Sequence, residues 1–343
     1  GCINQIKFQG RSFAGEDISN YKIVDTGDII YTRSPLKSKP YGIIKVVGDE
    51  IGIVSPLYIV NKVKEGNNSQ FIYRVFDSPE KTNKYLSPLV RKGAKNTMNI
   101  SNDEWLSGKI DVAPSYEEQY QIGLYFDHLD HLITLHQRKC EQTKNLKKYM
   151  LQKMFPQNGA KVPEIRFNGF THDWEQRKLG EVFKEYSEKN HTELPALTII
   201  QGGGTVKRED SDRNLMYDES NLSNYKMVRK DDFIVHLRSF EGGLEKSALD
   251  GIVSPAYHTF HSDVADSRFY YPYFRSHEFI KHKLVPHVYG IRDGRSIDID
   301  GMKIIEIPYT SMEEQRQIGD YLESLDHLIT LHQRHTDFYK KTS

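Results

Sequence analysis

The stretch EEQYQIGLYFDHLDHLITLHQR at residues 117–138 returns as EEQRQIGDYLESLDHLITLHQR at residues 313–334, 196 positions later. Seventeen of the 22 positions are identical. A helix repeated on so long a period, with different sequence between its copies, indicates a shared frame that holds two variable modules. The repeat therefore predicts a protein with two reading heads.

Both copies carry the signals of a long helix. Ser115 with Glu118, and Ser311 with Glu314, fit the S-x-x-E capping box, in which both side chains satisfy N–H groups of the first turn. Apolar residues then recur in steps of four, three and four, as in a coiled-coil seam. The seam residues are Ile122, Phe126, Leu129 and Ile133 in the first copy and Ile318, Leu322, Leu325 and Ile329 in the second. An amphipathic helix packed on one domain is the alternative, which the duplication disfavours.

The segments between the helices show short strand patterns broken by Gly, Pro, Asn and Asp. The strand candidates are residues 28–34, 41–48, 51–62 and 71–76 in the first segment, matched in order by 196–201, 232–240, 251–260 and 302–309 in the second. Identities relate the two segments: SNYK at 19–22 and 223–226, Asp28 and Asp232, Arg33-Ser34 and Arg238-Ser239, and GIVSP at 52–56 and 251–255. The chain is therefore expected to be two copies of one unit, a β-rich module followed by a long helix.

The first unit is the shorter one. Residues 162–183, the strand at 197–201 and part of 202–204 have no counterpart ahead of Gly1, and residues 145–156 have none in the second helix. We therefore expect a fragment, truncated at both ends, whose first module is impaired.

Composition is that of an ordinary globular chain: 343 residues, 37% of them hydrophobic, are enough for two domains with buried cores. No apolar run approaches the roughly 18 residues of a membrane span, and we expect no signal peptide. The two cysteines, Cys2 and Cys140, do not suggest a disulfide framework. These features predict a cytoplasmic protein.

The formal net charge is zero, which by itself argues against nucleic acid, but the cations are clustered. Residues 29–48 and 81–99 contain four and five Lys or Arg and no acid. Residues 267–295 contain six against two acids, interleaved with aromatic residues, which are Phe269, Tyr270, Tyr271, Tyr273 and Phe274. Basic patches with aromatics suit phosphate contact and base stacking. A solvated surface is the alternative for each cluster.

The sequence contains no convincing catalytic set. The run 202–204, GGG, follows a strand candidate, but no GK[ST] and no helix start follow it, so a tight turn is predicted in place of a phosphate loop. His136 and His332 fall on the seam, where a polar contact between helices is predicted in place of a metal ligand. No G-x-S-x-G elbow, Cys/His pairing or N-P-P-[FY] element is present. We predict no catalytic residue and no metal.

The motifs EEQ-x-QIG…LD-x-LI-x-LHQRK at 117–139, their second copy, and PEIRF-x-GF…DWEQRKLGE at 163–181 closely resemble the specificity subunits of type I restriction–modification systems. The resemblance covers essentially the whole chain. It implies an α+β fold of two β-rich target-recognition domains, at 1–114 and 159–310, separated by two long conserved helices at 115–158 and 311–343 that form an antiparallel coiled coil.

The resemblance also implies a mechanism. Each β-rich domain reads one half of a split DNA site, and the helices set the unread spacer between the halves. Two methyltransferase subunits dock on the chain, bind S-adenosylmethionine and methylate adenines that they flip out. Motor–nuclease subunits, with ATP and Mg, cut unmodified DNA. The chain itself is then a non-catalytic specificity subunit with no cofactor of its own.

Basic, Gly-containing loops at places where the two modules diverge are the predicted DNA contacts. Arginine is the commonest bidentate reader of guanine, so Arg238, Arg292 and Arg295 are predicted to contact bases and the lysines phosphates. The predicted DNA-binding residues are Arg33, Lys37, Lys39, Arg91, Lys92, Lys95, Arg238, Lys246, Tyr289, Arg292 and Arg295. The alternative for Arg292 and Arg295 is a turn closed against Asp293 and Asp298.

Two other functions stay open. One is the specificity portion of a fused restriction–methyltransferase enzyme, which a longer reading frame upstream would identify. The other is a coiled-coil scaffold whose β-rich modules bind protein. Salt separates a scaffold from a DNA reader, because DNA affinity falls steeply as salt rises and protein affinity falls much less.

Overall fold

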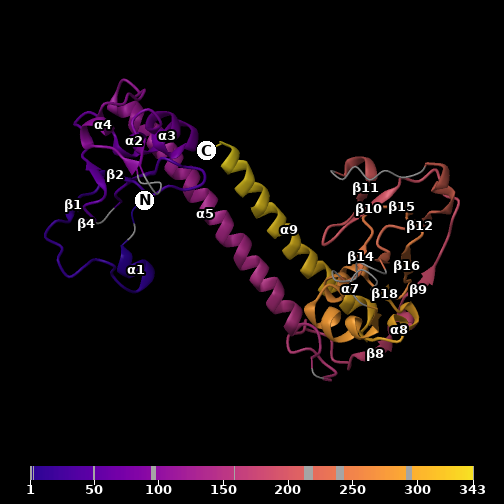
Figure 1. Cartoon of the computed structure of the whole chain (residues 1–343). Coiled ribbons are helices and arrows are strands. Elements are labelled where there is room, and N and C mark those ends of the chain that lie inside the picture. Colours follow the sequence, from indigo (N-terminus) through magenta and orange to yellow (C-terminus); the bar gives the residue numbers. More distant parts are fainter. Residues whose placement is uncertain are drawn as a thin grey trace. The chain divides into compact units, whose positions relative to one another are not determined.

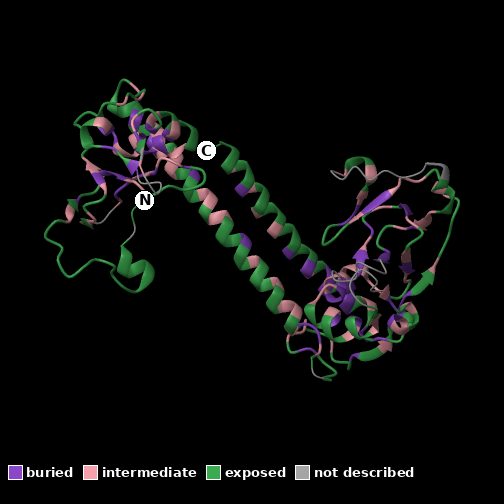
Figure 2. Cartoon of the chain, viewed as in Figure 1, coloured by how far each residue is buried: buried purple, intermediate pink, exposed green. Residues whose placement is uncertain are grey.

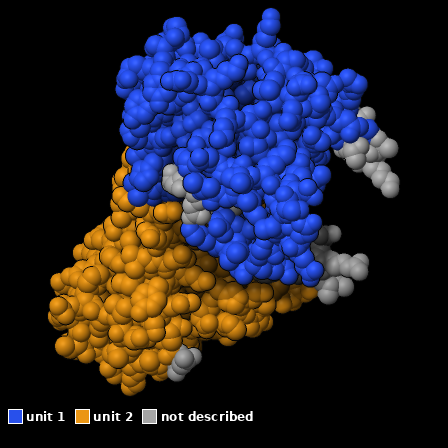
Figure 3. Space-filling view, turned by 90° about the vertical axis from the view of Figure 1, so that its left-hand side faces the viewer, with its two compact units in different colours: residues 1–135, 336–343 blue, residues 136–335 orange. Residues whose placement is uncertain are grey.

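The computed structural model describes residues 2, 4–48, 51–93, 98–157, 159–211, 219–236, 243–290 and 296–342. The chain divides into two compact units (Figure 3). Unit 1 comprises residues 1–135 and 336–343, and unit 2 comprises residues 136–335.

Both copies of the repeat are helical, as predicted. The two helices are α5 (Tyr116–Lys153) and α9 (Met312–Thr342). The hydroxyl oxygen of Ser115 accepts the N–H of Glu118 at 3.2 Å, and Ser311 accepts that of Glu314 at 3.3 Å. These bonds satisfy one otherwise unpaired donor in the first turn of each helix. The serine half of each predicted capping box is thereby confirmed.

Within unit 2, α9 runs antiparallel to the C-terminal part of α5 (Figure 1). The Nδ1 atoms of His136 and His332 lie 3.0 Å apart, and Lys147 Nζ lies 2.6 Å from the Asp326 carboxylate. Cys140 of α5 is buried, with its thiol 3.9 Å from the carbonyl oxygen of Ile329 in α9. Because residue numbers rise along one helix as they fall along the other, the antiparallel pairing is confirmed within unit 2, as is the polar contact predicted between the two histidines.

Unit 1 is built on a three-stranded antiparallel sheet with strand order β3-β2-β5, against which three short helices pack. Its elements before α5 are α1 (Gln5–Gln9), β1 (Lys22–Val24), β2 (Ile29–Thr32), β3 (Ile43–Val46), β4 (Gly52–Val54), β5 (Ile59–Asn61), α2 (Ser69–Asp77), α3 (Pro79–Leu86), β6 (Arg91–Lys92), β7 (Met98–Asn99) and α4 (Asn102–Leu106). The core lies between this sheet and α2, α3 and α4, where Tyr31 stacks on Trp105 with 5.1 Å between ring centroids.

Unit 2 is built on a four-stranded antiparallel sheet with strand order β14-β13-β16-β9. Its elements between α5 and α9 are β8 (Glu175–Lys178), α6 (Leu179–Val182), β9 (Lys184–Tyr186), β10 (Leu197–Ile200), β11 (Gly204–Lys207), η2 (Arg208–Asp210), η3 (Glu219–Asn224), β12 (Lys226–Val228), β13 (Phe233–His236), β14 (Glu245–Lys246), β15 (Gly251–Val253), β16 (Tyr257–His261), α7 (Ser267–Phe274), η5 (Phe279–Leu284), η6 (Val285–His287), β17 (Val288–Tyr289), β18 (Ser296–Ile297), α8 (Ile299–Lys303) and β19 (Glu306–Tyr309). Its largest core gathers around α7 and the start of α9 (Figure 2).

The two units repeat the same strand pairings, which supports the expectation of two copies of one unit. The pair β1–β4 corresponds to β12–β15, and β3-β2-β5 corresponds to β14-β13-β16. Lys22 Nζ donates to the carbonyl of Tyr58 at 2.6 Å, and Lys226 Nζ donates to that of Tyr257 at 2.7 Å. The repeated lysine of the SNYK motif therefore joins the same two parts of each unit.

One strand prediction is wrong, and so is part of the in-order match. Strand β2, within residues 28–34, corresponds to β13 and not to residues 196–201, and β3 corresponds to β14, because these strands have the same pairing partners. Residues 71–76, FIYRVF, lie in helix α2, which starts at the N-cap Asn68. An aromatic and β-branched run favours a strand, but here the helix buries Phe71, Tyr73 and Phe76 on the sheet. In the second unit, residues 302–309 are the end of α8 followed by β19, and the counterpart of α2 is α7.

In unit 2, Pro195 and Leu197 cover strand β15. The described part of unit 1 has no equivalent of these residues. A Cβ on Gly251 would lie 2.5 Å from the Leu197 side chain and 2.7 Å from the Pro195 carbonyl oxygen. The equivalent Gly52 of unit 1 has nothing within 4 Å among the described residues, and Ile23 on the paired strand β1 is 76% exposed. The second strand pair is therefore packed on both faces, whereas the first has one open face.

Candidate nucleic-acid interface

Two kinds of loop in each unit carry the predicted DNA-binding residues. The first joins β2 to β3 in unit 1 and β13 to β14 in unit 2. The second is the hairpin β6–β7 in unit 1 and β17–β18 in unit 2. The loops are therefore equivalent in pairs, although their sequences differ. A kept frame with different loops suits two heads that bind different targets.

The first loop of unit 1 contains three predicted contacts with different surroundings. Lys37 is exposed and Arg33 is half-buried. Lys39 is buried, and its ammonium donates to the carbonyl oxygens of Phe76 at 3.2 Å and Asp77 at 2.9 Å, at the C-terminus of α2. Burial lowers the pKa of Lys39. The structure thus gives Lys39 a role in holding the end of a helix in place of the predicted phosphate contact.

The hairpin β6–β7 presents a cation to solvent. The Arg91 side chain is 81% exposed, and its Nη2 lies 2.5 Å from Glu104 Oε1. An exposed pair of this kind contributes little to stability, so Arg91 can exchange its carboxylate partner for a phosphate at little cost. Lys92 follows in β6, and Lys95 lies outside the described residues.

In unit 2 the equivalent hairpin presents an aromatic ring. Tyr289 ends β17 and is 60% exposed. Lys246 ends β14, where its Nζ pairs with Asp231 at 3.0 Å. The three arginines predicted to contact bases lie outside the described residues: Arg238, Arg292 and Arg295. Their assignment stays a prediction, as does the alternative turn against Asp293.

The aromatic run at 269–274 is wrongly predicted to stack on bases. Phe269, Tyr270 and Phe274 are fully buried in the unit 2 core. The physical reason is that α7 turns its aromatic side inward, where the Tyr270 hydroxyl donates to the Pro308 carbonyl at 2.8 Å. These rings hold the fold together and do not reach a ligand outside it.

The run of three glycines forms the predicted tight turn between β10 and β11. Gly202 and Gly204 adopt φ of +80° and +70°, which favours glycine. Their N–H groups donate to the carboxylate of the buried Glu245, at 2.7 and 3.3 Å. A turn whose N–H groups converge is an anion site, and here the protein's own carboxylate occupies it.

The repeated helix motif docks a short helix in each unit. Gln119 Oε1 accepts the N–H of Asn68, the N-cap of α2, at 2.8 Å. Gln315 Oε1 accepts the N–H of Asp266, the N-cap of α7, at 2.9 Å. The glycine four residues later lets the two helices approach, because a Cβ on Gly319 would lie 3.1 Å from the backbone nitrogen of Phe269.

The first two residues of each predicted seam pack against the short helix of their own unit and not against the other long helix. Ile318 and Leu322 are buried in the unit 2 core, while Ile122 and Phe126 face α2 in unit 1. The buried seam residues are Leu129, Ile318, Leu322 and Leu325, and Ile122, Phe126, Ile133 and Ile329 are partly exposed. The coiled-coil pattern was read correctly as a helix face, but its first turns pack against the unit itself.

Glu314 is a site residue that sequence reasoning placed only in a capping box. Its side chain is 1% exposed and accepts two bonds from the Arg166 guanidinium, at 2.7 and 2.9 Å. It also accepts from the Trp174 indole N–H at 3.1 Å and from the Thr310 hydroxyl. The signal was present, since Arg166 and Trp174 belong to the PEIRF and DWEQRKLGE motifs.

Among the described residues, no group of three or more His, Cys, Asp or Glu side chains is arranged to hold a metal ion. No helix in the described part of the chain is long and apolar enough to cross a bilayer.

Two units that share one frame and differ in their loops are the arrangement expected of a two-headed recognition protein. A family model described as type I restriction modification DNA specificity domain matches residues 171–337. The matched stretch lies almost wholly within unit 2.

A curated relative extends the match. The specificity subunit of the type I restriction enzyme MjaVIII from Methanocaldococcus jannaschii is 27% identical over 249 residues, which cover 66% of this chain and 58% of that protein. The alignment therefore spans less than two thirds of the relative's length.

Two solved structures align with most of the chain. The S subunit of a type I restriction–modification system from M. genitalium aligns with a TM-score of 0.55 at 13% identity, over 92% of this chain and 80% of that chain. The HsdS subunit from Thermoanaerobacter tengcongensis aligns with a TM-score of 0.47 at 18% identity, over 95% of this chain and 81% of that chain. The likeness to the M. genitalium subunit confirms the predicted α+β fold class.

Proposed function

We propose that this chain is the specificity subunit of a type I restriction–modification system, a non-catalytic protein whose two units each read one half of a bipartite DNA site. The observation that carries the proposal is the pairing of loops: β2–β3 with β13–β14, and β6–β7 with β17–β18, on a frame that both units share. The family match at 171–337 supports the same function for unit 2.

The partners follow from this role. Two methyltransferase subunits bind the chain and supply S-adenosylmethionine, and motor–nuclease subunits supply ATP and Mg. The chain binds no cofactor itself and acts in the cytoplasm. Its contribution is to select the DNA sequence at which the partner subunits react. The paired helices set the length of the unread spacer. Exposed cations such as Lys37 and Arg91 contact phosphates, so affinity should fall steeply with salt.

The test is to co-express the chain with its methyltransferase subunit in a methylation-free host and to map adenine methylation over the genome. We expect one split motif with a fixed unread spacer. Methylation of one half-motif, or of a palindrome of it, would mean that unit 1 does not read DNA and that two chains pair. An assembled complex that methylates nothing would contradict the proposal.

A matched pair of variants assigns the half-sites. Arg91→Ala changes an exposed residue of unit 1, and Tyr289→Ala changes one at the equivalent hairpin of unit 2. Each should weaken binding to, or relax, one half of the motif, and a lost phosphate contact should lower the salt slope by about 1. Arg292→Ala should likewise affect only the half-site of unit 2. Equal effects on both halves would show that the assigned loops do not read separate half-sites.

A further inference from the structure

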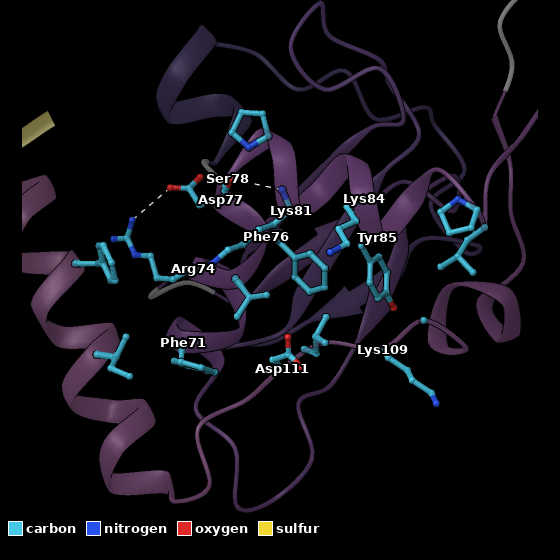
Figure 4. A pocket seen from close by; sticks show the side chains of 18 of the residues that line it. Phe71, Arg74, Phe76, Asp77, Ser78, Lys81, Lys84, Tyr85, Lys109 and Asp111 are labelled. Atoms are coloured by element: carbon cyan, nitrogen blue, oxygen red, sulfur yellow. Dashed lines mark hydrogen bonds and ion pairs between the residues drawn. The ribbon is translucent and has the colours of Figure 1, made fainter. Parts of the chain in front are cut away.

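Unit 1 contains a cavity of about 930 Å³ beside the start of α5 (Figure 4). Its walls come from α2, α3, residues 108–111 and α5. In Figure 4, Phe71 and Phe76 project from α2, and Lys109 and Asp111 lie on the irregular stretch between α4 and α5. The cavity lies wholly within unit 1.

The frame of this cavity has a counterpart in unit 2. Helices α2 and α7 share the pattern S-x-F-x-Y-x-x-F-x-S, at 69–78 and 267–276. The bonds of Gln119 and Gln315 to the N-caps of these helices fix the same register in both units. Four cavity-lining residues therefore have equivalents in unit 2. The equivalent pairs are Phe71 and Phe269, Val75 and Tyr273, Ile122 and Ile318, and Phe126 and Leu322.

In unit 2 this frame is filled by the chain that follows α5. Phe155 lies between Phe269, at 4.8 Å between ring centroids, and Tyr273, at 5.2 Å. Trp174 lies 5.6 Å from Phe269, and Met154 is buried in the same core. The filling consequently includes a Met-Phe pair at the end of a helix and a tryptophan 19 residues after the phenylalanine.

The glutamate at the start of the long helix is covered in unit 2 and uncovered in unit 1. Glu314 at the start of α9 is enclosed by Arg166 and Trp174. The equivalent Glu118 at the start of α5 is exposed. The equivalent isoleucines differ in the same way, since Ile318 is 1% exposed whereas Ile122 is partly exposed and lines the cavity. Unit 1 therefore shows both the apolar and the acidic surface that unit 2 covers.

We propose that this cavity is the docking site for a polypeptide segment of the type that residues 149–178 supply in unit 2. A Met-Phe pair at a helix end would pack against Phe71 and Val75, and an arginine and a tryptophan would bind Glu118. The residues at 109–113 form no strand, and β19 at the equivalent place in unit 2 pairs with β8. The end of the docked segment can pair with this stretch as a strand. The proposal is independent of DNA binding.

The test uses a labelled synthetic peptide with the sequence of residues 149–178, added to the full chain. We expect saturable binding by fluorescence anisotropy and slower amide hydrogen exchange in α2 and α3. A peptide with Phe155→Ala should bind at least about tenfold more weakly, because it loses the phenyl ring that packs on two aromatic rings of α7 in unit 2. Exchange in unit 2 should not change, since its own segment stays in place.

Variants of the chain locate the site. Ile122→Ser removes an apolar wall and Glu118→Gln removes the charge, so each should weaken binding about tenfold or more. Glu117→Gln alters the adjacent exposed carboxylate and should leave binding unchanged. The fluorescence of the buried Trp105 verifies that each variant keeps the fold of unit 1.

Three results would overturn the proposal. The first is the lack of saturable binding up to about 1 mM peptide, the weakest affinity that a specific contact of this size would have. The second is binding that ignores both Ile122→Ser and the Phe155→Ala peptide. The third is an apolar dye that occupies the cavity and is not displaced by the peptide. The volume falls in the range of about 300–1,000 Å³ seen for small-molecule pockets, so this last result would assign the cavity to a small ligand.

Discussion

Lys45 and Glu245 occupy equivalent positions in the two units and bond equivalent tyrosines with opposite charge. Lys45 Nζ lies 2.7 Å from the Tyr73 hydroxyl, and the Glu245 carboxylate lies 2.8 Å from the Tyr271 hydroxyl. Each group has a counterion one helical turn after its tyrosine. Asp77 is 3.4 Å from Lys45, and Arg275 bonds Glu245. The network keeps its geometry while its polarity is reversed, which shows how two units can diverge in charge on one frame.

Replacing Glu245 should destabilise unit 2 more than replacing Lys45 destabilises unit 1. Glu245→Gln removes the charge that the turn of Gly202 and Gly204 and the Arg275 guanidinium share, and breaking a buried pair in this way costs about 3–5 kcal/mol. Lys45→Met should cost less, because that side chain is 31% exposed. Urea denaturation measures both, with Trp174 as the only tryptophan for unit 2 and Trp105 as the only one for unit 1. Equal losses would mean that burial does not decide the cost.

The two GIVSP motifs offer a matched glycine test. Gly251→Ala would place a methyl group 2.5 Å from Leu197, a distance that forces the neighbouring chain to move, so we expect a loss of about 1–3 kcal/mol. Gly52→Ala at the equivalent place has open space and should change stability by less than about 0.5 kcal/mol. Thermal unfolding of the two single variants measures the difference. A large loss for Gly52→Ala would mean that its strand pair is covered in solution.

The histidine contact between the helices predicts loss of stability in acid. Desolvation lowers the pKa of His136 and of His332, and the neighbouring His335 and Lys139 lower both further. A histidine with a lowered pKa binds fewer protons when folded, so its contribution is complete above the ordinary value of 6.5 and falls as the pH drops below it. Unit 2 should therefore unfold more easily at about pH 5 than at about pH 8 through this contact.

Variants separate this contact from other titrations. His332→Leu should flatten the acid loss, because it removes a titrating group from the helix interface. His327→Leu on the same helix changes an exposed residue and should keep the slope. Urea midpoints across the pH range provide the measurement. An unchanged slope in His332→Leu would assign the acid loss to other groups.

His261 should act in the opposite direction. Its hydrogen bond to the buried Asp232 carboxylate raises the pKa of His261, with a smaller contribution from Asp263. A raised pKa means that this contribution is complete below the ordinary value of 6.5 and is lost as the pH rises through the raised value. His261→Asn should therefore lose more stability at low pH than at high pH. Equal losses at both ends of the range would show that the imidazole is neutral in the folded unit.

Much of the architecture could be predicted because its signals are local. The repeat, its serine caps and the glycine turn at 202–204 depend on neighbours along the chain, and each is present as expected. The GIVSP strands correspond as expected, but the in-order match of the other strands is wrong, because β2 corresponds to β13 and not to residues 196–201. The 71–76 run failed because its aromatic and β-branched residues suit a strand and a buried helix face equally, and the packing of α2 on the sheet decided between them.

The roles of single polar and aromatic residues needed the tertiary structure. Lys39 has the composition of a phosphate ligand but binds a helix end 37 residues away, and the rings of α7 have the composition of a stacking surface but form the core. Glu314 meets Arg166 across 148 residues of chain. Burial and pairing of this kind depend on which distant groups the fold brings together. Local spacing therefore identified the frame and its loops. Only the packing of the folded chain decided which side chains are buried in the frame and which stay exposed to a partner.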